Sequence, residues 1–301
     1  MRLRLGARGS ALSMAQAEMV RSALAGRNEV ELVTVRTTGD RLSGSGKPIS
    51  WKGDFTRELD EALLDSRIDL AVHSLKDVPS DIPAGLVLTA VPEREDPSDV
   101  LVSREGRTLG ELAPGARVGT SSPRRRAQVL AARPDLVVEE ARGNVDTRIR
   151  RLREGRWDAI VLARAGLSRL NRLDEIAEIF DASVMLPAVG QGALAIVARE
   201  ADGETRGALR EMDHPASHRE VLAERAFLAR LEAGCRGPVA ARARVRDGNL
   251  RIDGAVFAED GSRVIRDEAE GRAEAAEAVG RELAERLLAR GAAEWIARAS
   301  R

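Results

Sequence analysis

The sequence has little of several residue types, and each scarcity excludes a class of protein. One cysteine among 301 residues rules out an intrachain disulfide and a cysteine-rich zinc site, and we expect no metal. Aromatic residues make up 2% of the chain and tyrosine is absent, so stacking platforms for single-stranded nucleic acid are poorly supplied. No apolar run approaches the ~20 residues of a membrane span. We therefore expect a cytoplasmic protein, and a single thiol fits a reducing compartment.

Neither sign of charge is in excess. The chain has 48 basic and 48 acidic residues, and this net charge of +0 argues against a protein that coats nucleic acid. Lysine is scarce, since only Lys47, Lys52 and Lys76 occur and the other 45 basic residues are arginine. A single arginine is therefore weak evidence of function here, whereas a lysine stands out from the background.

Short β-like runs alternate with helical patterns over the first 200 residues. This alternation predicts βαβ units and a mostly parallel sheet, and nine strands favour two α/β domains over one. The expected strands are 3–5, 30–35, 69–73, 86–91, 100–103, 117–120, 136–139, 159–163 and 194–198. The expected helices among them are 11–24, 55–64, 123–132 and 145–154.

Composition indicates where the domains meet. A polar, proline-bounded segment at 92–98 and a glycine-rich segment at 186–192 are predicted to be crossings between the two α/β domains. After a polar stretch the rhythm changes to a helix at 219–231, strands at 239–245, 250–258 and 263–268, and a helix at 273–290. We expect a first domain of 1–92 with 193–210, a second of 98–186, and a small α+β third domain of 215–301.

The most informative turn joins the strand at 117–120 to the helix at 123–132. Ser122 is a predicted N-cap, and Pro123 suits the first helical position because its missing N–H is not needed there. Three arginines at 124–126 then add positive charge to a helix end that is already partly positive. If a ligand's carboxylate or phosphate balanced this positive charge, the turn would be a binding site. A solvated basic turn is the alternative.

Two further strand-to-helix turns carry arginine beside a cap residue. One has Arg142, the predicted N-cap Asn144 and Arg148, and the other has Arg8 and the predicted N-cap Ser10. Ligands of α/β sheets bind at the carboxyl ends of the strands, so the three turns predict one cleft for several anionic groups. Carboxylates suit the guanidinium fork, which binds them bidentately. Neither GxxxxGK(S/T) nor GxGxxG follows a strand, so ATP and NAD are not expected.

The strand at 69–73 ends in a run of polar residues. His73 and Ser74 close the strand, and Lys76 and Asp77 follow in a proline-bounded turn. A carboxylate at this position can hold a cationic intermediate or a proton. The alternative for Asp77 is a turn residue that bonds its own backbone. We interpret His73 as a structural residue.

The single cysteine, Cys235, lies beside Gly234 and Arg236 in a loop after the helix at 219–231. This setting could leave the thiol accessible and partly activated as thiolate. The alternative is an inert small residue in a tight turn. The nearest histidines are about a helix away in sequence, which disfavours a protease-type nucleophile.

Together these segments resemble the hydroxymethylbilane synthase (porphobilinogen deaminase) family, essentially end to end. The matching strings are RGS at 8–10, AVHSLKDVP at 71–79, EREDP at 93–97, GTSS at 119–122, RGNV at 142–145, LPAVGQGA at 186–193 and GC at 234–235. The two longest strings are highly specific, and the lone cysteine stands where the family attaches its cofactor.

The resemblance implies a transferase of haem (tetrapyrrole, porphyrin) biosynthesis. Such an enzyme condenses four porphobilinogen molecules head to tail with loss of ammonia, and water then releases hydroxymethylbilane. A dipyrromethane cofactor primes the chain and would be joined by a thioether to Cys235. Asp77 corresponds to the catalytic aspartate, which stabilises the cation formed when ammonia leaves. The family also implies a monomer.

The resemblance further implies which residues bind the acetate and propionate carboxylates. Those matching cofactor-binding positions are Lys76, Ser122, Arg124, Arg125, Arg142, Asn144 and Arg148. Those matching substrate-binding positions are Arg8, Ser10, Ser74, Arg169 and Lys52.

Four positions depart from the family pattern. Pro123 replaces a common leucine and should have little effect. Asp146 stands where glycine is common, and an extra acid could weaken or reorient the carboxylate site. Lys52 matches a lysine of a flexible loop at 42–55, but Pro48 and Asp54 replace its more usual residues, so a role as a lid is less secure.

Two other functions fit part of the pattern. Two doubly wound α/β domains joined by two crossings also describe periplasmic solute-binding proteins and effector domains of transcription regulators. Such a protein would bind an anion without needing Cys235 or a third domain. A cysteine-nucleophile transferase would need an activating base near Cys235 and would carry no permanent adduct. We expect an α/β protein of two such periplasmic-binding-protein-like domains with a small α+β C-terminal domain.

Overall fold

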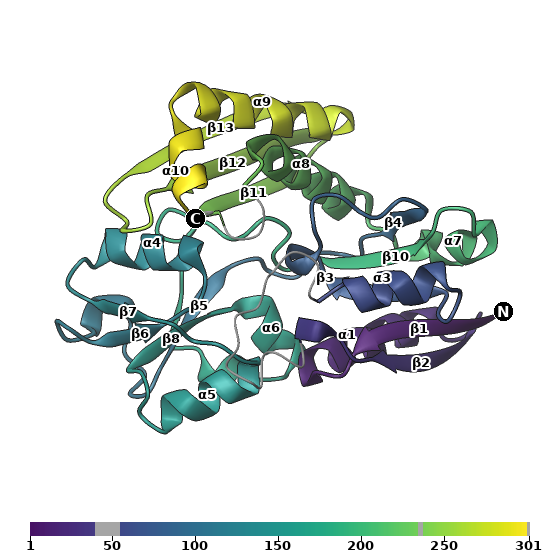
Figure 1. Cartoon of the computed structure of the whole chain (residues 1–301), viewed down its shortest axis with the longest axis horizontal. Coiled ribbons are helices and arrows are strands. Elements are labelled where there is room, and N and C mark those ends of the chain that lie inside the picture. The colour runs from purple at the N-terminus through teal and green to yellow at the C-terminus, as the bar shows by residue number, and fades with distance from the viewer. Residues whose placement is uncertain (40–54, 234–236, 300–301) are drawn as a thin grey trace. The chain divides into compact units, whose positions relative to one another are not determined.

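The computed structural model describes residues 1–39, 55–233 and 237–299 (Figure 1). The chain divides into two compact units, Met1–Glu95 with Ala193–His218, and Asp96–Gly192 with Arg219–Arg301. The chain passes from the first unit to the second after Glu95 and returns after Gly192. These positions lie within or beside the segments 92–98 and 186–192, where the sequence predicts crossings. A division into three domains stays a prediction.

The first unit is built on a five-stranded sheet in the order β2-β1-β3-β10-β4. The strands are β1 (Arg2–Arg8), β2 (Glu29–Val35), β3 (Leu70–Ser74), β4 (Leu86–Ala90) and β10 (Leu194–Arg199). The α-helices that lie wholly within it are α1 (Ala11–Leu24), α3 (Arg57–Leu64) and α7 (Gly203–Leu209), and the 3-10 helices are η1 (Leu75–Asp77) and η4 (Arg210–Met212).

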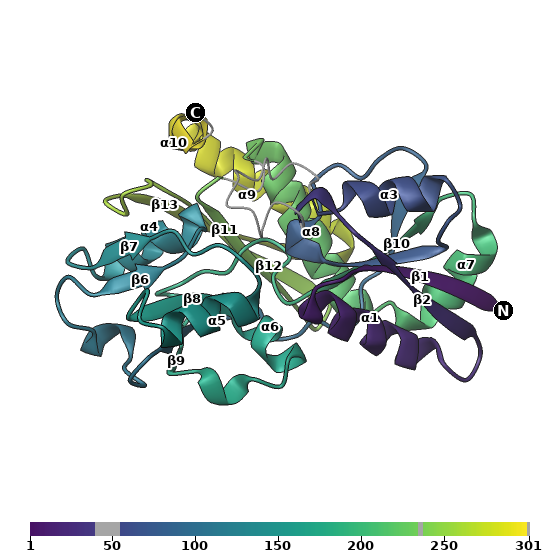
Figure 2. The ribbon, with the colours of Figure 1, turned by 60° about the horizontal axis from the view of Figure 1, so that its bottom comes forward.

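Helices α1 and α3 cover opposite faces of this sheet (Figure 2). Alternate residues of β1, among them Leu3 and Leu5, join the apolar face of α1 in one core. On the other face Gly6 leaves room for α3, because a Cβ there would lie 2.3 Å from Cδ1 of Ile68 and 3.0 Å from Cδ2 of Leu59. The strand that carries Arg8 is thus fixed from both sides.

The second unit contains another five-stranded sheet, in the order β7-β6-β8-β5-β9. Its strands are β5 (Asp99–Ser103), β6 (Arg117–Gly119), β7 (Val137–Glu139), β8 (Ala159–Ala163) and β9 (Glu178–Ile179). The helices around it are α4 (Pro123–Ala132), α5 (Val145–Arg153) and α6 (Arg164–Arg169), with 3-10 helices η2 (Leu109–Glu111) and η3 (Leu173–Glu175).

The two large sheets are mostly parallel, as predicted, because four strands of each run in one direction and one strand opposes them. In the first sheet β1 runs parallel to β2 and β3, but β10 is antiparallel to β3 and β4. In the second sheet β6 runs parallel to β7 and β8, but β5 is antiparallel to β8 and β9. The antiparallel strands are the first ones after each crossing. A strand that enters a sheet from a crossing needs no helical crossover, so its direction is free to oppose its neighbours.

The C-terminal part of the second unit is a three-stranded antiparallel meander with helices. It comprises β11 (Val239–Arg246), β12 (Asn249–Phe257), β13 (Val264–Arg272), η5 (Ala273–Ala275), α9 (Ala276–Ala289) and α10 (Ala292–Ala299). It also holds residues 219–231 of α8 (Pro215–Leu231), and Figure 1 shows α8 and α9 side by side. Phe227, Ile252 and Leu283 meet in its core, which confirms the expected α+β part. No described helix is long and apolar enough to cross a membrane.

Candidate functional site

The turn between β6 and α4 forms as its residues predict. Ser122 is the N-cap in an extended conformation, and its hydroxyl accepts the backbone N–H of Arg125 at 3.4 Å. Pro123 occupies the first turn. The exposed first-turn arginine is Arg126, whereas Arg124 and Arg125 turn inward and are only 3% and 6% exposed. The alternative of a solvated basic turn therefore does not describe those two residues.

Both inward arginines bind the carboxylate of Asp99, the first residue of β5. Arg124 donates to Oδ2 at 2.6 Å, and Arg125 donates to Oδ1 from Nε at 2.9 Å and from a terminal nitrogen at 2.7 Å. Arg124 also donates to the backbone carbonyl of Leu186, and Arg125 to that of Val161. Asp99, which sequence reasoning missed, is fully buried. The available signal was a charged residue that opens an otherwise apolar strand.

This cluster keeps an excess of positive charge. Burial by itself would raise the pKa of Asp99, but the charges of Arg124 and Arg125 and their hydrogen bonds hold the pKa of this carboxyl well below its usual range. Burial also lowers the pKa of Arg124, against the attraction of Asp99. Within the described residues, one buried carboxylate thus faces two buried guanidinium groups. An anion in contact with the pair would complete the charge balance.

Two polar atoms at the same turn make no hydrogen bond within the described part of the chain. They are Nε of Arg124 and the hydroxyl oxygen of Ser121, and both are buried. A buried donor without a partner is costly unless a ligand or water satisfies it. The β6–α4 turn therefore fits a group that brings carboxylate oxygens.

The turn before α5 is held differently. Asn144 has the extended backbone of an N-cap, but its exposed side chain makes no capping hydrogen bond. The guanidinium Nε of Arg148 donates to the carbonyl of Gly143 at 2.7 Å, and Gly143 needs its φ of +108° to present that carbonyl. Arg142 pairs with Glu140 at 2.6 Å. Asn144 is the N-cap residue, as predicted, but it caps the helix through its backbone conformation only and not through its side-chain amide.

Asp146 is exposed and forms an ion pair within the second unit. Its carboxylate accepts from Arg172 at 2.5 Å, and the same guanidinium bonds Glu175 at 2.8 Å. The extra acid at this departure from the family pattern is thus paired with Arg172, the residue that precedes η3. Arg169, at the end of α6, donates to the carbonyl of Gly192 at 2.6 Å.

In the first unit the turn after β1 is also ordered as expected. Ser10 caps α1 by accepting the N–H of Ser13 at 3.3 Å, and the hydroxyl of Ser13 accepts the backbone N–H of Arg8 at 3.1 Å. The guanidinium of Arg8 lies over the ring of Phe55, 4.2 Å from its centroid. At the end of β3, Ser74 accepts from the buried amide of Gln16 at 2.8 Å.

Asp77 closes the 3-10 helix η1, in which Lys76 is also half-buried. The turn is anchored by its backbone, since Leu75 N–H donates to the carbonyl of Ala193 at 3.0 Å and Val78 N–H to that of Leu75 at 3.0 Å. The carboxylate of Asp77 makes no hydrogen bond or ion pair with the residues that the structure describes. The alternative of a turn residue that bonds its own backbone is therefore not what this turn contains.

His73 is a buried residue of β3. It is 5% exposed, and burial, followed by the charge of Arg8, lowers its pKa from 6.5 to about 4. A histidine that stays neutral in the interior matches the interpretation of a structural residue.

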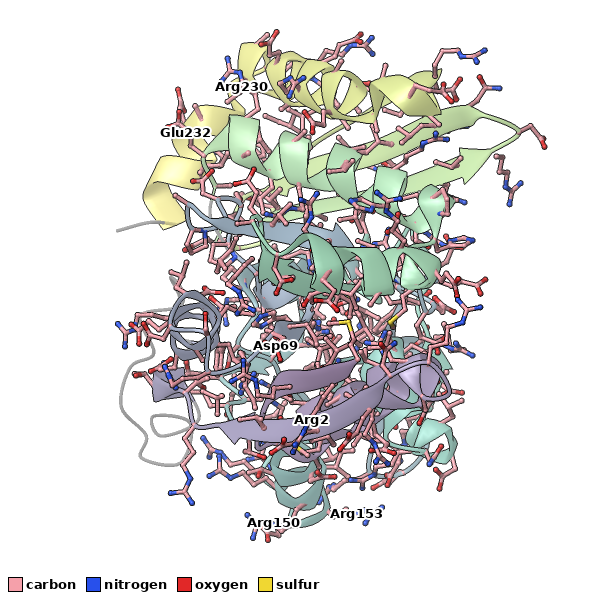
Figure 3. All side chains as sticks on the ribbon, turned by 90° about the vertical axis from the view of Figure 1, so that its right-hand side faces the viewer. Arg2, Asp69, Arg150, Arg153, Arg230 and Glu232 are labelled. Carbon is pink, nitrogen blue, oxygen red and sulfur yellow. The ribbon has the colours of Figure 1, made fainter. Side chains whose placement is uncertain are left out.

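Cys235 and Lys52 lie outside the described residues, as do Pro48 and Asp54. Ala233 and Gly237, the nearest described residues on either side of the cysteine, are joined by a hydrogen bond of 3.1 Å from the N–H of Gly237 to the carbonyl of Ala233. A Cβ on Gly237 would lie 2.8 Å from Cβ of Ala233, so glycine is required for this approach. Before it, α8 ends at Leu231. Near that end Arg230 pairs with Glu285 of α9 at 3.3 Å, and Glu232 is exposed (Figure 3).

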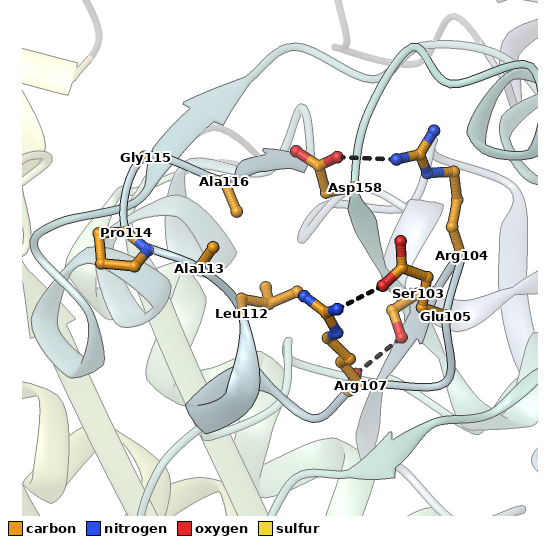
Figure 4. A pocket seen from close by; sticks show the side chains of 10 residues that line it. All are labelled: Ser103, Arg104, Glu105, Arg107, Leu112, Ala113, Pro114, Gly115, Ala116 and Asp158. Carbon is orange, nitrogen blue, oxygen red and sulfur yellow. Dashed lines mark hydrogen bonds and ion pairs between the residues drawn. The ribbon is translucent and has the colours of Figure 1, made fainter.

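A separate cavity of about 240 Å³ opens in the second unit (Figure 4). Its lining holds no predicted site residue: Ser103, Arg104, Glu105, Arg107, Leu112, Ala113, Pro114, Gly115, Ala116 and Asp158. Several of its lining residues come just before β6 and β8 in the sequence, whereas Ser122 comes just after β6. The cavity therefore lies at the opposite end of these strands from Ser122. Arg104 pairs with Asp158 and Arg107 with Glu105, which leaves no excess charge for an anion.

The predicted site residues divide between the units. Arg8, Ser10, Ser74, Lys76 and Asp77 belong to the first, and Ser122, Arg124, Arg125, Arg142, Asn144, Arg148 and Arg169 to the second. Direct contacts join Arg124 and Arg125 through Asp99. A single cleft that gathers all of them stays a prediction.

Comparison with known proteins gives consistent matches. A family model described as "Porphobilinogen deaminase, dipyromethane cofactor binding domain" matches residues 3–207, and "Porphobilinogen deaminase, C-terminal domain" matches 218–289. A porphobilinogen deaminase of Rubrobacter xylanophilus is 52% identical over 294 residues, covering 97% of this chain and 95% of that protein. One of Pelobacter propionicus is 47% identical over 293 residues, covering 96% and 94%. Among solved structures, a putative methionine-binding lipoprotein from Bacillus subtilis has a TM-score of 0.41 and 13% identity, covering 70% of this chain and 89% of that one.

Proposed function

The chain belongs to the porphobilinogen deaminase family, and we propose that three sets of its residues anchor the cofactor, bind carboxylates and stabilise developing positive charge. The enzyme is a hydroxymethylbilane synthase, a transferase of tetrapyrrole biosynthesis. It condenses four porphobilinogen molecules head to tail, releases ammonia and yields hydroxymethylbilane on a dipyrromethane primer. The primer supplies the pyrrole terminus to which each new ring is added.

Cys235 is the proposed anchor of the cofactor through a thioether. It is the only thiol of the chain, so no other cysteine can carry the bond. The anchored approach of Gly237 to Ala233 fixes the chain on either side of the attachment residue.

We assign the cofactor's carboxylates to the side chains that match the family's cofactor-binding positions: Lys76, Ser122, Arg124, Arg125, Arg142, Asn144 and Arg148. The observation that carries this assignment is the buried pair of Arg124 and Arg125, which has one internal counter-charge in Asp99. The partnerless Nε of Arg124 and hydroxyl of Ser121 add donors that a carboxylate would satisfy.

The substrate's carboxylates are assigned to Arg8, Ser10, Ser74, Arg169 and Lys52. Arg8 is pre-oriented on the ring of Phe55, and Ser74 by the amide of Gln16. Groups that are already ordered lose less side-chain freedom when the ligand binds.

Asp77 is the proposed catalytic residue. Its carboxylate has no partner among the described residues, while its backbone is fixed in η1. It is thus available to hold the positive charge that develops on a pyrrole as ammonia leaves, and to accept pyrrole N–H groups. A carboxylate placed in advance stabilises such a charge without reorganisation at the moment of reaction.

We further propose that the enzyme works in the cytoplasm as a monomer and binds no nucleic acid. The equal numbers of acidic and basic residues argue against nucleic acid as a partner. The family resemblance supports the monomer, and the single thiol fits a reducing compartment. Light scattering of the purified protein tests the oligomeric state, and a dimer mass would contradict it.

Intact-protein mass spectrometry tests the proposal. The purified wild type should carry a covalent addition equal to two substrate-derived pyrrole units, and Cys235→Ser should carry none. Asp77→Ala is the matched control, because it should retain the addition yet lose most turnover, by about 10²-fold or more.

Each result separates the alternatives. An active wild type without the addition would contradict the attachment and favour an ordinary cysteine nucleophile. An inactive, unmodified wild type that binds small carboxylates would favour an anion-binding protein. Near-normal turnover of Asp77→Ala would remove this residue from its role.

A further inference from the structure

The return crossing, 186–192, passes through the interior of the second unit, and buried side chains satisfy its backbone. All of its residues except Ala188 are buried. Gln128 accepts the N–H of Leu186 at 2.8 Å and donates to its carbonyl at 3.1 Å. Glu224, itself fully buried, accepts the N–H of Gly190 at 2.7 Å. These contacts hold the crossing in place.

Gln191 has a different position in this network, because its side chain reaches the charged cluster. It is 1% exposed, and its Nε2 donates to the carbonyl of Pro97 at 2.7 Å and to Oδ1 of Asp99 at 2.9 Å. The same Oδ1 accepts both hydrogen bonds from Arg125. Gln191 therefore holds the same carboxylate oxygen that accepts two hydrogen bonds from the guanidinium group of Arg125.

We propose that Asp99 and Gln191 are positioning residues of the cofactor's carboxylate site, in which Gln191 orients Asp99 and Asp99 orients the guanidinium groups of Arg124 and Arg125. The inference rests on the proposed function of those two arginines. A guanidinium already held by Asp99 has lost its rotamer freedom before the ligand arrives, so less is lost on binding. The three charged groups sum to one positive charge, which matches the cluster to a single carboxylate.

The test compares two amide substitutions of similar burial. Gln191→Met removes the hydrogen bonds of the amide to Pro97 and Asp99 at nearly constant volume. Gln128→Met is the control, because Gln128 is 4% exposed and also bonds the crossing at Leu186, yet makes no contact with Asp99. Each full-length chain is prepared without a supply of porphobilinogen and is then incubated with porphobilinogen at a series of concentrations. Intact mass spectrometry follows the covalent addition.

We expect Gln191→Met to raise the half-saturating porphobilinogen concentration about tenfold, the size expected for one hydrogen bond to a charged group, with the final mass unchanged. Gln128→Met should stay within about twofold of the wild type after its own loss of thermal stability. Asp99→Asn would leave two buried cations without a counter-charge and is expected to lose the fold, which is why the test is placed at Gln191.

Two results would overturn the inference. An unchanged half-saturating concentration in Gln191→Met removes Asp99 and Gln191 from the role, and equal shifts in both variants reduce Gln191 to a structural support of the crossing. Cys235→Ser, measured in parallel, separates this failure from that of the proposed function. A normal mass addition in that variant would contradict the attachment itself, whatever Gln191→Met does.

Discussion

Burial distinguishes two of the arginines assigned to the cofactor from those that the composition supplies. Arg150 and Arg153 are exposed on α5, and Figure 3 shows their side chains directed away from the helix. Arg124 and Arg125 are buried against Asp99. In a chain with 45 arginines the sequence can locate an arginine at a turn, but it cannot say which way the side chain points. That depends on the distant Asp99, and no local pattern connects the two.

His73 gives a prediction about pH. The folded chain holds the pKa of His73 near 4, while the unfolded chain protonates it at about 6.5. Between these values the unfolded state binds more protons, so the free energy of unfolding falls as the pH drops from 6.5 towards 4. We expect the wild type to lose about 2–3 kcal/mol more than His73→Gln between pH 7 and 4.5, in urea unfolding followed by circular dichroism.

The comparison between the two chains isolates His73. Burial raises the pKa of Asp60 to about 6, which acts in the opposite direction over the same range, but Asp60 is present in both chains and cancels. Parallel pH dependences of the wild type and His73→Gln would mean that His73 is accessible to protons in the folded state.

At the scale of elements, the sequence predicted most helices and strands and missed several short ones. The sequence bounds of α1, α4 and β8 are those of the structure. The two-residue strand β9 and the helices α6, α7 and α10 were not predicted, because each is too short to show a period. Strand direction was also missed at β5 and β10, since it depends on how the chain re-enters a sheet and not on the residues of the strand.

Helix packing gives a prediction with its own control. Gly280 of α9 faces α8, and a Cβ there would lie 2.1 Å from the carbonyl oxygen of Ala223. Gly280→Ala should therefore lower the free energy of unfolding by about 2 kcal/mol or more, despite the better helix propensity of alanine. Gly207 of α7 has no atom within 4 Å of its Cβ position, so Gly207→Ala should raise it by about 0.5–1 kcal/mol.

Both variants are measured by urea unfolding of the full chain. A stabilised Gly280→Ala would show that α8 and α9 separate more easily than their contact indicates. The result bears on function, because α8 leads directly into the residues that precede Cys235.

At the scale of the molecule, the sequence could predict two α/β sheets, an α+β end and the crossings because these follow from the order of periodic segments along the chain. The motif strings also indicated candidate site residues, several of which lie at strand-to-helix turns. The contacts that hold these side chains in place could not be predicted. They are the ion pairs of Asp99 with the arginines, the hydrogen bond of Gln16 to Ser74 and the contact of Phe55 with Arg8. Each support comes from a segment far from its partner in sequence, so only the folded chain brings the two together.

The central claim is that buried guanidinium groups at the β6–α4 turn hold the carboxylates of a cofactor bound to this chain. Its most direct test is the intact mass of Arg125→Gln beside that of Arg150→Gln, each purified as folded protein from cells that make porphobilinogen. Arg150→Gln should carry the two-pyrrole addition as fully as the wild type. Arg125→Gln should carry it on less than about a tenth of the chains, because a buried positive charge that faces the cofactor's carboxylate is lost. A fully loaded Arg125→Gln would contradict the claim.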